Sequence, residues 1–236
     1  MDAAADRRFD AVLFDFSGVM VSSAFDALGR HAADHGMSED EFLEFLLGPY
    51  AQDGDHAWHR AERGEIGILD WATDTMARAE EAGMGLDLSF MATTLGDLEV
   101  HDVMVDAARE VRAAGCRTSL VTNNIAEGRD TWRPMLPLDE LFDDVIDSSE
   151  VGLRKPNPEI YLLALQRLGS VDGQPIEPSR AVMLDDHPGN CAGALAAGLH
   201  AIEVRDPAIA ADELRAARHP CRAQPSSPAA VTIALN

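Results

Sequence analysis

Four short segments of this chain carry side chains that could together bind a metal ion and transfer a phosphoryl group. Carboxylates suit a hard cation such as Mg²⁺, which prefers oxygen ligands. A lysine and a hydroxyl suit the oxygens of a phosphoryl group, and an aspartate beside them can attack phosphorus to form an aspartyl-phosphate. The segments are Asp15-Phe16-Ser17-Gly18-Val19, Val121-Thr122-Asn123-Asn124, Gly152-Leu153-Arg154-Lys155-Pro156 and Met183-Leu184-Asp185-Asp186.

Each segment, taken singly, has an ordinary structural explanation. Asp15 could belong to a turn, because Asp-x-x-Gly is common in turns, and the same holds for Thr122-Asn123 after a strand. Lys155 could be a solvated lysine, and Asp185-Asp186 could cap a helix. The functional interpretation therefore depends on whether the fold brings the four segments together.

Each segment lies at the end of an expected strand or in a loop that leads into an expected helix. Val12-Leu13-Phe14 is a short apolar run ended by Asp15, which is typical of a buried strand that opens into a loop. Helical patterns separate the expected strands, and such β-α units predict an α/β fold with a doubly wound parallel sheet. Ligands bind at the carboxyl ends of strands in these sheets, so the segments should meet there. The other expected strands are residues 118–121, 142–146, 181–184 and 200–204.

The chain between the first and second segments is expected to be helical. Ser38 and Glu41 form a capping-box pattern ahead of a helix that Gly48-Pro49 stops. We therefore expect an α/β core from residues 1–21 and 98–218, a helical cap from 22–97 and a flexible tail from 219–236. Helical patterns in the insert cover residues 24–35, 39–46, 55–63, 68–82 and 87–95.

The composition is strongly acidic, with 19 Lys and Arg against 41 Asp and Glu and a formal net charge of −22. Such a surface disfavours nucleic acids and anionic membranes, and no stretch is long and apolar enough to span a bilayer. The first residues lack the apolar segment of a secretory signal, and an odd number of cysteines without zinc-like spacing indicates reduced thiols. We expect a cytoplasmic protein with a small phosphorylated substrate; the oligomeric state is not indicated.

In their order and spacing the four segments resemble the haloacid dehalogenase-like (HAD) hydrolase superfamily, over about residues 9–205. The resemblance implies a Rossmann-like core, and the helical insert is similar to the small α-helical cap of subfamily I. Residues 58–66 (WHRAERGEI) and 152–161 (GLRKPNPEIY) are similar to one phosphatase branch of that subfamily. This branch includes a sugar 1-phosphate phosphatase and the phosphatase domain of mammalian soluble epoxide hydrolase.

The resemblance implies a phosphoric monoester hydrolase with one Mg²⁺. By position, Asp15 would be the nucleophile and a metal ligand. The backbone carbonyl of Ser17 and the carboxylate of Asp185 would be further ligands. Asp186 would bind the metal through water or hold Lys155.

The resemblance also implies how the phosphoryl group is bound. Thr122 and backbone N–H groups near Asn123 would bind its oxygens, and Lys155 would neutralise charge on the nucleophile and the phosphate. Arg60 and Arg63 belong to a basic and aromatic helix face in the expected cap. That face either is an ordinary solvated one or meets the substrate.

One position departs from the common phosphatase pattern of the superfamily. Most members place a second Asp two residues after the nucleophile, where it protonates the leaving oxygen and then activates water. This chain has Ser17 there, and a hydroxyl is a very weak acid. Two alternatives to a phosphatase stay open. The first is a dehalogenase in which Asp15 attacks carbon, although such relatives usually lack the paired acids. The second is a non-catalytic binding or regulatory protein.

Overall fold

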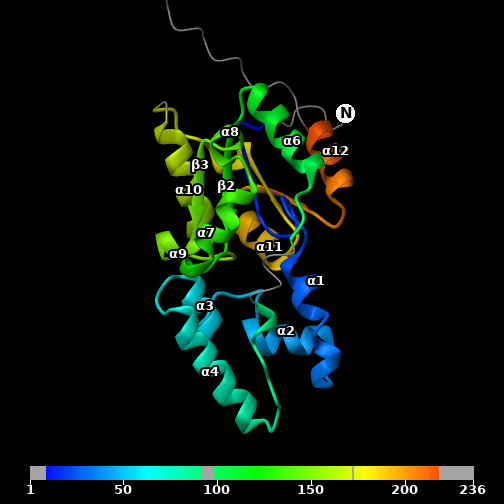
Figure 1. The fold of residues 1–236 in the computed structure, drawn as a ribbon. Helices are drawn as coiled ribbons and strands as arrows, with labels where there is room; N and C mark the ends of the chain where they lie inside the picture. Colours follow the sequence, from blue (N-terminus) through cyan, green and yellow to red (C-terminus); the bar gives the residue numbers. More distant parts are fainter. Residues whose placement is uncertain (1–8, 92–97, 172, 218–236) are drawn as a thin grey trace, which may run out of the picture.

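Five parallel strands form the sheet at the centre of the protein (Figure 1). In this computed structural model, which describes residues 9–91, 98–171 and 173–217, the strand order is β3-β2-β1-β4-β5. The order reverses at β1, and ligands bind at such a switch point in open parallel sheets. The α/β fold predicted from the sequence is confirmed. The strands are β1 (Ala11–Phe14), β2 (Arg117–Thr122), β3 (Asp144–Asp147), β4 (Ala181–Asp185) and β5 (His200–Glu203).

Helices cover both faces of the sheet, and alternate residues of β1 face the two layers. Val12 and Phe14 belong to an apolar cluster with residues of α6 and α12, whereas Ala11 and Leu13 belong to one with residues of α10 and α11. Because both faces are covered, β1 is apolar throughout. The four helices are α6 (Asp102–Ala113), α10 (Pro158–Ser170), α11 (Pro188–Ala196) and α12 (Pro207–Ala217).

The other elements of the core are short. The sequence predicts a helix from about residue 126 that Pro134 and Pro137 interrupt, and the structure divides this stretch into short helices because proline lacks an amide hydrogen. The sequence does not predict α9. The elements are η3 (Ala126–Gly128), α7 (Arg129–Trp132), η4 (Arg133–Met135), α8 (Leu138–Leu141), α9 (Ser148–Val151) and η5 (Pro178–Arg180).

A helical insert, defined here as the described residues 22–91, follows β1. It contains no β-strand. The predicted helix at residues 87–95 lies partly outside the described residues, and the predicted boundaries between core and cap stay a prediction. The elements of the insert are α1 (Ala24–Gly29), η1 (Ala32–His35), α2 (Glu39–Leu47), α3 (Ala57–Glu62) and α4 (Ile68–Glu81).

Local sequence explains where α2 begins and why the first predicted helix is broken. The Ser38 hydroxyl accepts a hydrogen bond from the Glu41 N–H, and the Glu41 carboxylate accepts one from the Ser38 N–H, so the predicted capping box is confirmed. The single helix predicted over residues 24–35 is wrong: α1 ends at Gly29, a residue that weakens helices, and a separate short 3₁₀ helix follows.

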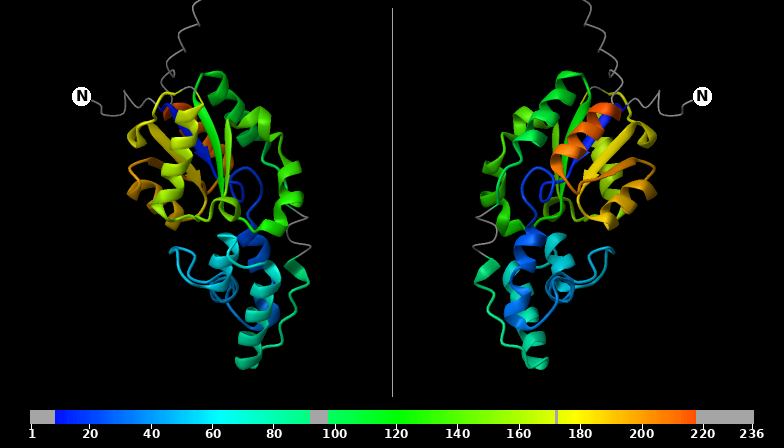
Figure 2. Two further views of the ribbon diagram at one scale, coloured as in Figure 1. Left: turned by 90° about the vertical axis from the view of Figure 1, so that its left-hand side faces the viewer. Right: turned by 90° about the vertical axis from the view of Figure 1, so that its right-hand side faces the viewer.

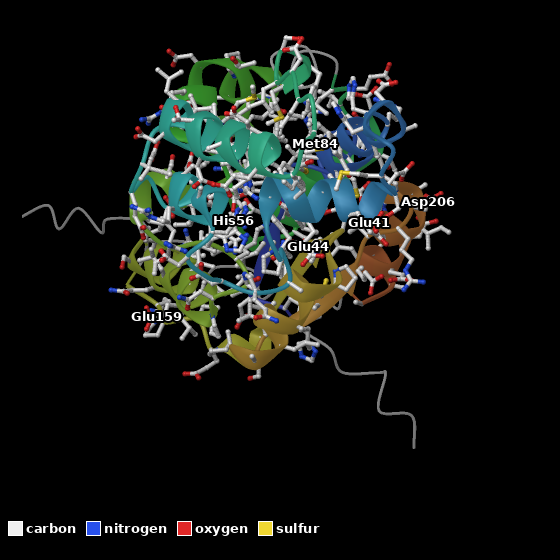
Figure 3. All side chains as sticks on the ribbon, turned by 90° about the horizontal axis from the view of Figure 1, so that it is seen from below. Glu41, Glu44, His56, Met84, Glu159 and Asp206 are labelled. Atoms are coloured by element: carbon white, nitrogen blue, oxygen red, sulfur yellow. The ribbon has the colours of Figure 1, made fainter. Side chains whose placement is uncertain are left out.

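The chain passes into the insert and back to the core through adjacent segments. Val21 forms an antiparallel bridge with Val100, and the Ser22 N–H donates a hydrogen bond to the carbonyl of Glu99 at 2.8 Å. The insert lies beyond the sheet at one end of the molecule, as two side views show (Figure 2). Seen from that end, α2, which carries the labelled Glu41 and Glu44, lies near the middle of the view, and the core residues Glu159 and Asp206 lie towards its edges (Figure 3).

Two further expectations concern the environment of the protein. None of the helices in the described part of the chain has the length and apolar character needed to cross a membrane. Cys191 is a buried free thiol. The expectation that the other cysteines are reduced stays a prediction.

Candidate active site

The register of the sheet places the predicted nucleophile beside the paired acids. Phe14 of β1 pairs with Leu184 of β4, and the Asp15 N–H continues the pairing by donating to the Leu184 carbonyl at 2.9 Å. Asp15 and Asp185 therefore leave their strands side by side, at the sheet end that faces the insert (Figure 1). Thr122 is the last residue of the neighbouring strand β2 and is buried.

Lys155 joins two of the carboxylates. Its Nζ atom lies 2.6 Å from Asp15 Oδ1 and 2.7 Å from Asp185 Oδ2, and all three side chains are buried. Burial opposes the charge of the amine, but the neighbouring carboxylates prevail and raise the pKa of Lys155. Burial also raises the pKa of Asp15 well above its usual range, and the charge of Lys155 only partly offsets this.

The two adjacent acids have different partners. Asp185 Oδ1 accepts hydrogen bonds from the His187 N–H at 2.9 Å and from Asn190 Nδ2 at 3.0 Å, while its other oxygen meets Lys155. Asp186 has a long contact of 3.4 Å with the Ser23 hydroxyl. The lysine therefore pairs with Asp185, and not with Asp186 as one of the sequence-based alternatives has it.

The carboxylates form a group that fits a hard metal ion. Carboxylate oxygens of Asp15, Asp185 and Asp186 all lie within 4.8 Å of one another. Burial and the charge of Asp185 raise the pKa of Asp186 to about 7, which shows how much negative charge is crowded here. A Cβ atom on Gly18, whose φ is +76°, would lie 1.9 Å from Asp186 Oδ2, so this close approach needs glycine. An all-oxygen donor set with excess negative charge suits Mg²⁺.

Asn123 has a positioning role that the sequence does not reveal. Its Oδ1 accepts a hydrogen bond from the Lys155 N–H at 2.8 Å, and its Nδ2 donates to the Lys155 carbonyl at 2.9 Å. The side chain of Asn123 thus holds the backbone of the lysine. Thr122 lies beside it with its hydroxyl 3.4 Å from the Asn123 carbonyl.

Arg60 and Arg63 are not brought to this site. The Arg63 guanidinium is bound by Asp53 and Glu65, with a distance of 2.6 Å from its Nε to Glu65 Oε1. Arg60 is half-buried and lies near Glu65 and Asp55. Local carboxylates of the insert thus hold both arginines, and neither lines the cavity next to the predicted nucleophile.

The insert instead reaches the core through a buried ion pair that the sequence interpretation missed. The Nε atom of Arg154, a fully buried residue, lies 2.7 Å from Glu62 Oε2 of α3. The Tyr50 hydroxyl donates to the other Glu62 oxygen at 2.8 Å and accepts from Asn123 Nδ2 at 3.2 Å. Glu62 lies in residues 58–66 and Arg154 in residues 152–161, the two stretches that resemble one phosphatase branch. Their opposite charges are the feature of the sequence from which this ion pair could have been predicted.

We expect Glu62→Ala to lower the free energy of unfolding by about 3–5 kcal/mol, because it leaves the buried charge of Arg154 without its partner. Glu65→Ala is the matched control. Glu65 also pairs with arginine but is largely exposed, so its removal should cost no more than about 1 kcal/mol. Urea unfolding of both variants measures the difference, and equal losses would refute the importance of the buried pair.

A cavity of about 500 Å³ lies between the sheet edge and the insert. Phe16, Ser17, Thr122 and Asn123 line it on the core side, so it reaches the residues next to Asp15. Aromatic and aliphatic residues of the insert form much of the opposite wall. A ligand in this cavity would have its reacting end at the carboxylates and the rest of its body against the insert.

A family model for haloacid dehalogenase-like hydrolases matches residues 9–198. Together with the parallel sheet and the carboxylate–lysine site, this shows that the chain belongs to the haloacid dehalogenase-like hydrolase family. The expected family resemblance is confirmed, including its likeness to the phosphatase-like branch.

Curated relatives cover most of this chain. Mouse "Acyl-CoA dehydrogenase family member 10" is 34% identical over 218 residues, which are 89% of this chain and 19% of that protein. Pig "Bifunctional epoxide hydrolase 2" is 29% identical over 217 residues, 86% of this chain and 38% of that protein. The chain thus spans well under half the length of these two relatives. Escherichia coli "Hexitol phosphatase A" is 26% identical, with 85% of both chains covered.

Solved structures share the fold. A predicted HAD-like family hydrolase from Porphyromonas gingivalis has a TM-score of 0.57 and 23% identity, covering 82% of this chain and 90% of that one. A HAD family enzyme from Bacteroides thetaiotaomicron, in complex with magnesium and inorganic phosphate, has a TM-score of 0.53 and 16% identity, covering 82% and 93%. The L-2-haloacid dehalogenase of Xanthobacter autotrophicus has a TM-score of 0.54 and 18% identity, covering 82% and 76%. At these identities the likeness shows the fold alone.

Proposed function

We propose that this protein is a Mg²⁺-dependent phosphatase that hydrolyses a small phosphorylated substrate through an aspartyl-phosphate on Asp15. The observation that carries the proposal is the contact of Lys155 Nζ with both Asp15 and Asp185 in a buried site. A buried lysine between carboxylates supplies a fixed positive charge next to a nucleophile. The phosphatase named among the relatives, which aligns over most of its length, supports this reaction class.

The proposed reaction has two steps on Asp15. One carboxylate oxygen attacks phosphorus, the bond from phosphorus to the substrate oxygen breaks, and the substrate leaves as an alcohol after taking a proton. Water then attacks the aspartyl-phosphate, releasing inorganic phosphate and restoring the carboxylate. Asp15 Oδ1 already binds Lys155 Nζ and accepts the Phe16 N–H at 2.7 Å, so we assign the attack to Oδ2. In this proposal the Thr122 hydroxyl binds a phosphoryl oxygen.

The residues that would hold Mg²⁺ are Asp15, the backbone carbonyl of Ser17 and the Asp185-Asp186 pair. Both oxygens of Asp185 already have protein partners, whereas Asp186 is less engaged. We therefore assign the direct carboxylate contact to Asp186, beside Asp15. When bound, the ion neutralises negative charge on the phosphoryl oxygens.

A panel of phosphate monoesters, assayed for released phosphate with and without Mg²⁺, tests this function. The dehalogenase alternative predicts instead that halide is released from 2-haloacids in excess EDTA. Phosphate release that depends on Mg²⁺ and on Asp15 supports the proposal. Halide release without metal would replace it, and no turnover of either class would favour a binding protein.

Ser17 should make the reaction sensitive to the leaving group. Its hydroxyl accepts a hydrogen bond from the Ala24 N–H at 2.8 Å at the start of α1, and it is too weak an acid to protonate the departing oxygen. General acid catalysis is typically worth about 10²–10⁴-fold, so we expect the logarithm of kcat/KM to fall steeply as the pKa of the leaving group rises. Among esters that bind equally well, aryl, acyl and sugar 1-phosphates should therefore react faster than simple alkyl phosphates.

The matched variants are Ser17→Asp and Ser17→Ala. We expect the aspartate to flatten the dependence on the leaving group, and the alanine to leave it steep. The slopes are compared under conditions in which chemistry limits the rate. A wild-type slope near zero would show that another group already donates the proton.

A further inference from the structure

The cavity beside the predicted nucleophile has mostly apolar walls. Its apolar lining comes from α1, α2, α3 and α4 of the insert and from the core segment that contains η3, α7 and η4. Its volume of about 500 Å³ falls in the range of pockets that take drug-sized organic molecules. The aromatic and larger aliphatic residues include Phe25, Leu28, Leu47, Trp58, Ile68, Trp71, Ile125, Trp132 and Met135.

Most of the polar side chains in this lining already have partners within the protein. Tyr50 and Glu62 hydrogen-bond to each other, and Asn123 holds the Lys155 backbone. The Ser17 hydroxyl accepts the hydrogen bond from the start of α1 described above. Tyr50, Glu62 and Asn123 would have to give up existing bonds in order to bind hydroxyl groups of a ligand, as a sugar would require. The Ser17 hydroxyl is engaged as an acceptor and can still donate one hydrogen bond.

Other polar side chains of the lining are engaged in part, each through one oxygen. Asn124 Oδ1 accepts the Ile125 N–H at 3.0 Å, and Glu127 Oε1 accepts the Ile68 N–H at 3.0 Å at the start of α4. The Thr131 hydroxyl also lines the cavity, and no described residue is its hydrogen-bond partner. The indole N–H of Trp132 has no partner among the described residues either, but it is buried.

The charge of the lining disfavours a second anionic group on the ligand. Among the described residues that line the cavity, the charged ones are Glu62 and Glu127. No Lys, Arg or His is found among these lining residues. Glu62 is neutralised by Arg154, which leaves a net negative charge. Lys155 is buried between Asp15 and Asp185 at the sheet edge and serves the phosphoryl end.

We propose that the substrate is a phosphate monoester whose organic part is bulky, apolar and free of any further charged group. This inference rests on the proposed phosphatase function and adds the substrate class. The phosphoryl group lies at Asp15 and Lys155, and the apolar body enters the cavity against the insert. Its burial provides the binding energy, since few polar groups in the walls are available to recognise hydroxyls.

A series of 4-n-alkylphenyl phosphates, from methyl to hexyl, tests the proposal. Their leaving groups have nearly the same pKa, so the series changes apolar length without changing the chemistry. We expect kcat/KM to rise by about threefold to fourfold for each methylene that is buried, until the cavity is full. The charged comparator, 4-(2-carboxyethyl)phenyl phosphate, should react more slowly than the alkyl ester of similar size. A flat or falling series, or preference for the charged ester, would overturn the proposal.

Ala72 and Ala77 provide a matched pair of variants on α4. Ala72 lines the cavity, whereas Ala77 is an exposed residue of the same helix outside it. Ala72→Phe should shorten the alkyl chain that gives the highest kcat/KM, and Ala77→Phe should keep the chain-length preference of the wild type. Thermal unfolding verifies that both variants are folded. An unchanged chain-length preference in Ala72→Phe would contradict the assignment of this cavity.

A further experiment distinguishes an error in the proposed phosphatase reaction from an error in the proposed substrate class. Non-hydrolysable 4-n-alkylbenzylphosphonates are used as binding probes in a thermal-shift assay. If no ester is hydrolysed but longer phosphonates raise the Tm more than shorter ones, the proposed reaction is wrong and the apolar site stands. If phosphate is released but short or charged esters are preferred, the reaction stands and the substrate class is wrong.

Discussion

Asp15→Asn should lower phosphate release by at least about 10³-fold while the protein remains folded. An amide is a poor nucleophile and cannot form the acyl-phosphate that the proposed reaction requires, and loss of a nucleophile is among the largest single effects in enzymes. The fold should survive because Lys155 keeps its contact of 2.7 Å with Asp185. An amide oxygen can also still accept the Phe16 N–H that now binds the carboxylate.

Asp10→Asn is the matched control for this variant. Asp10 precedes β1 at the opposite end of the strand, where it pairs with Arg180 on the protein surface. The same chemical change there should leave activity near wild type and cost little stability. Single-turnover assays and thermal unfolding of the two variants measure both effects. Near-normal activity in Asp15→Asn would place the nucleophile elsewhere.

The sheet and the residues at its edge are predictable from the sequence because local patterns determine them. Val12 to Phe14 form an apolar run that can only be buried, and Asp15 follows at the point where the strand must end. Since parallel strands end at a common edge, the positions of Asp15, Thr122 and Asp185 relative to one another follow from the topology. Ser38 and Glu41 are likewise local partners, and they mark the start of α2 correctly.

The contacts of the insert are not predictable in the same way. Arg60 and Glu62 belong to α3 and Arg63 follows directly as its C-cap, and the sequence alone cannot tell which of them faces the core. The structure turns Glu62 inward to Arg154, while Asp53 and Glu65 hold Arg63 within the insert. Such pairings depend on how two distant segments pack, so a basic face is a weak predictor of substrate contact.

At the proposed metal site, the roles of Asp185 and Asp186 likewise cannot be predicted from the sequence. They are identical in type and adjacent in sequence, so the residues alone cannot distinguish a metal ligand from a partner of Lys155. The structure separates them by their contacts: Lys155, the His187 N–H and Asn190 donate to Asp185, whereas Asp186 has a long contact of 3.4 Å to the Ser23 hydroxyl. Substitution of each acid should therefore have a different result.

We expect Asp186→Asn to lower Mg²⁺-dependent activity by roughly 10²-fold to 10³-fold, because metal ions supply several kcal/mol of charge stabilisation in such reactions. The variant should also lose most of the thermal stabilisation that Mg²⁺ gives the wild type. Binding to the folded state alone stabilises a protein by about 2.7 kcal/mol at a ligand concentration of 100 times Kd. Without Mg²⁺ the variant should be at least as stable as wild type, since it removes one of the crowded negative charges.

Asp185→Asn is the matched comparison and should act through Lys155. Removing this charge leaves the buried amine with Asp15 as its remaining close carboxylate, so the variant should lose stability even in EDTA-treated protein. Its activity should be lower than that of the wild type when Mg²⁺ is added. Its gain in Tm on adding Mg²⁺ should be largely retained. Magnesium titrations followed by thermal unfolding, with EDTA-treated protein as the reference, distinguish the two acids. If Asp185→Asn loses the stabilisation and Asp186→Asn keeps it, the direct ligand is Asp185, as the family resemblance implies.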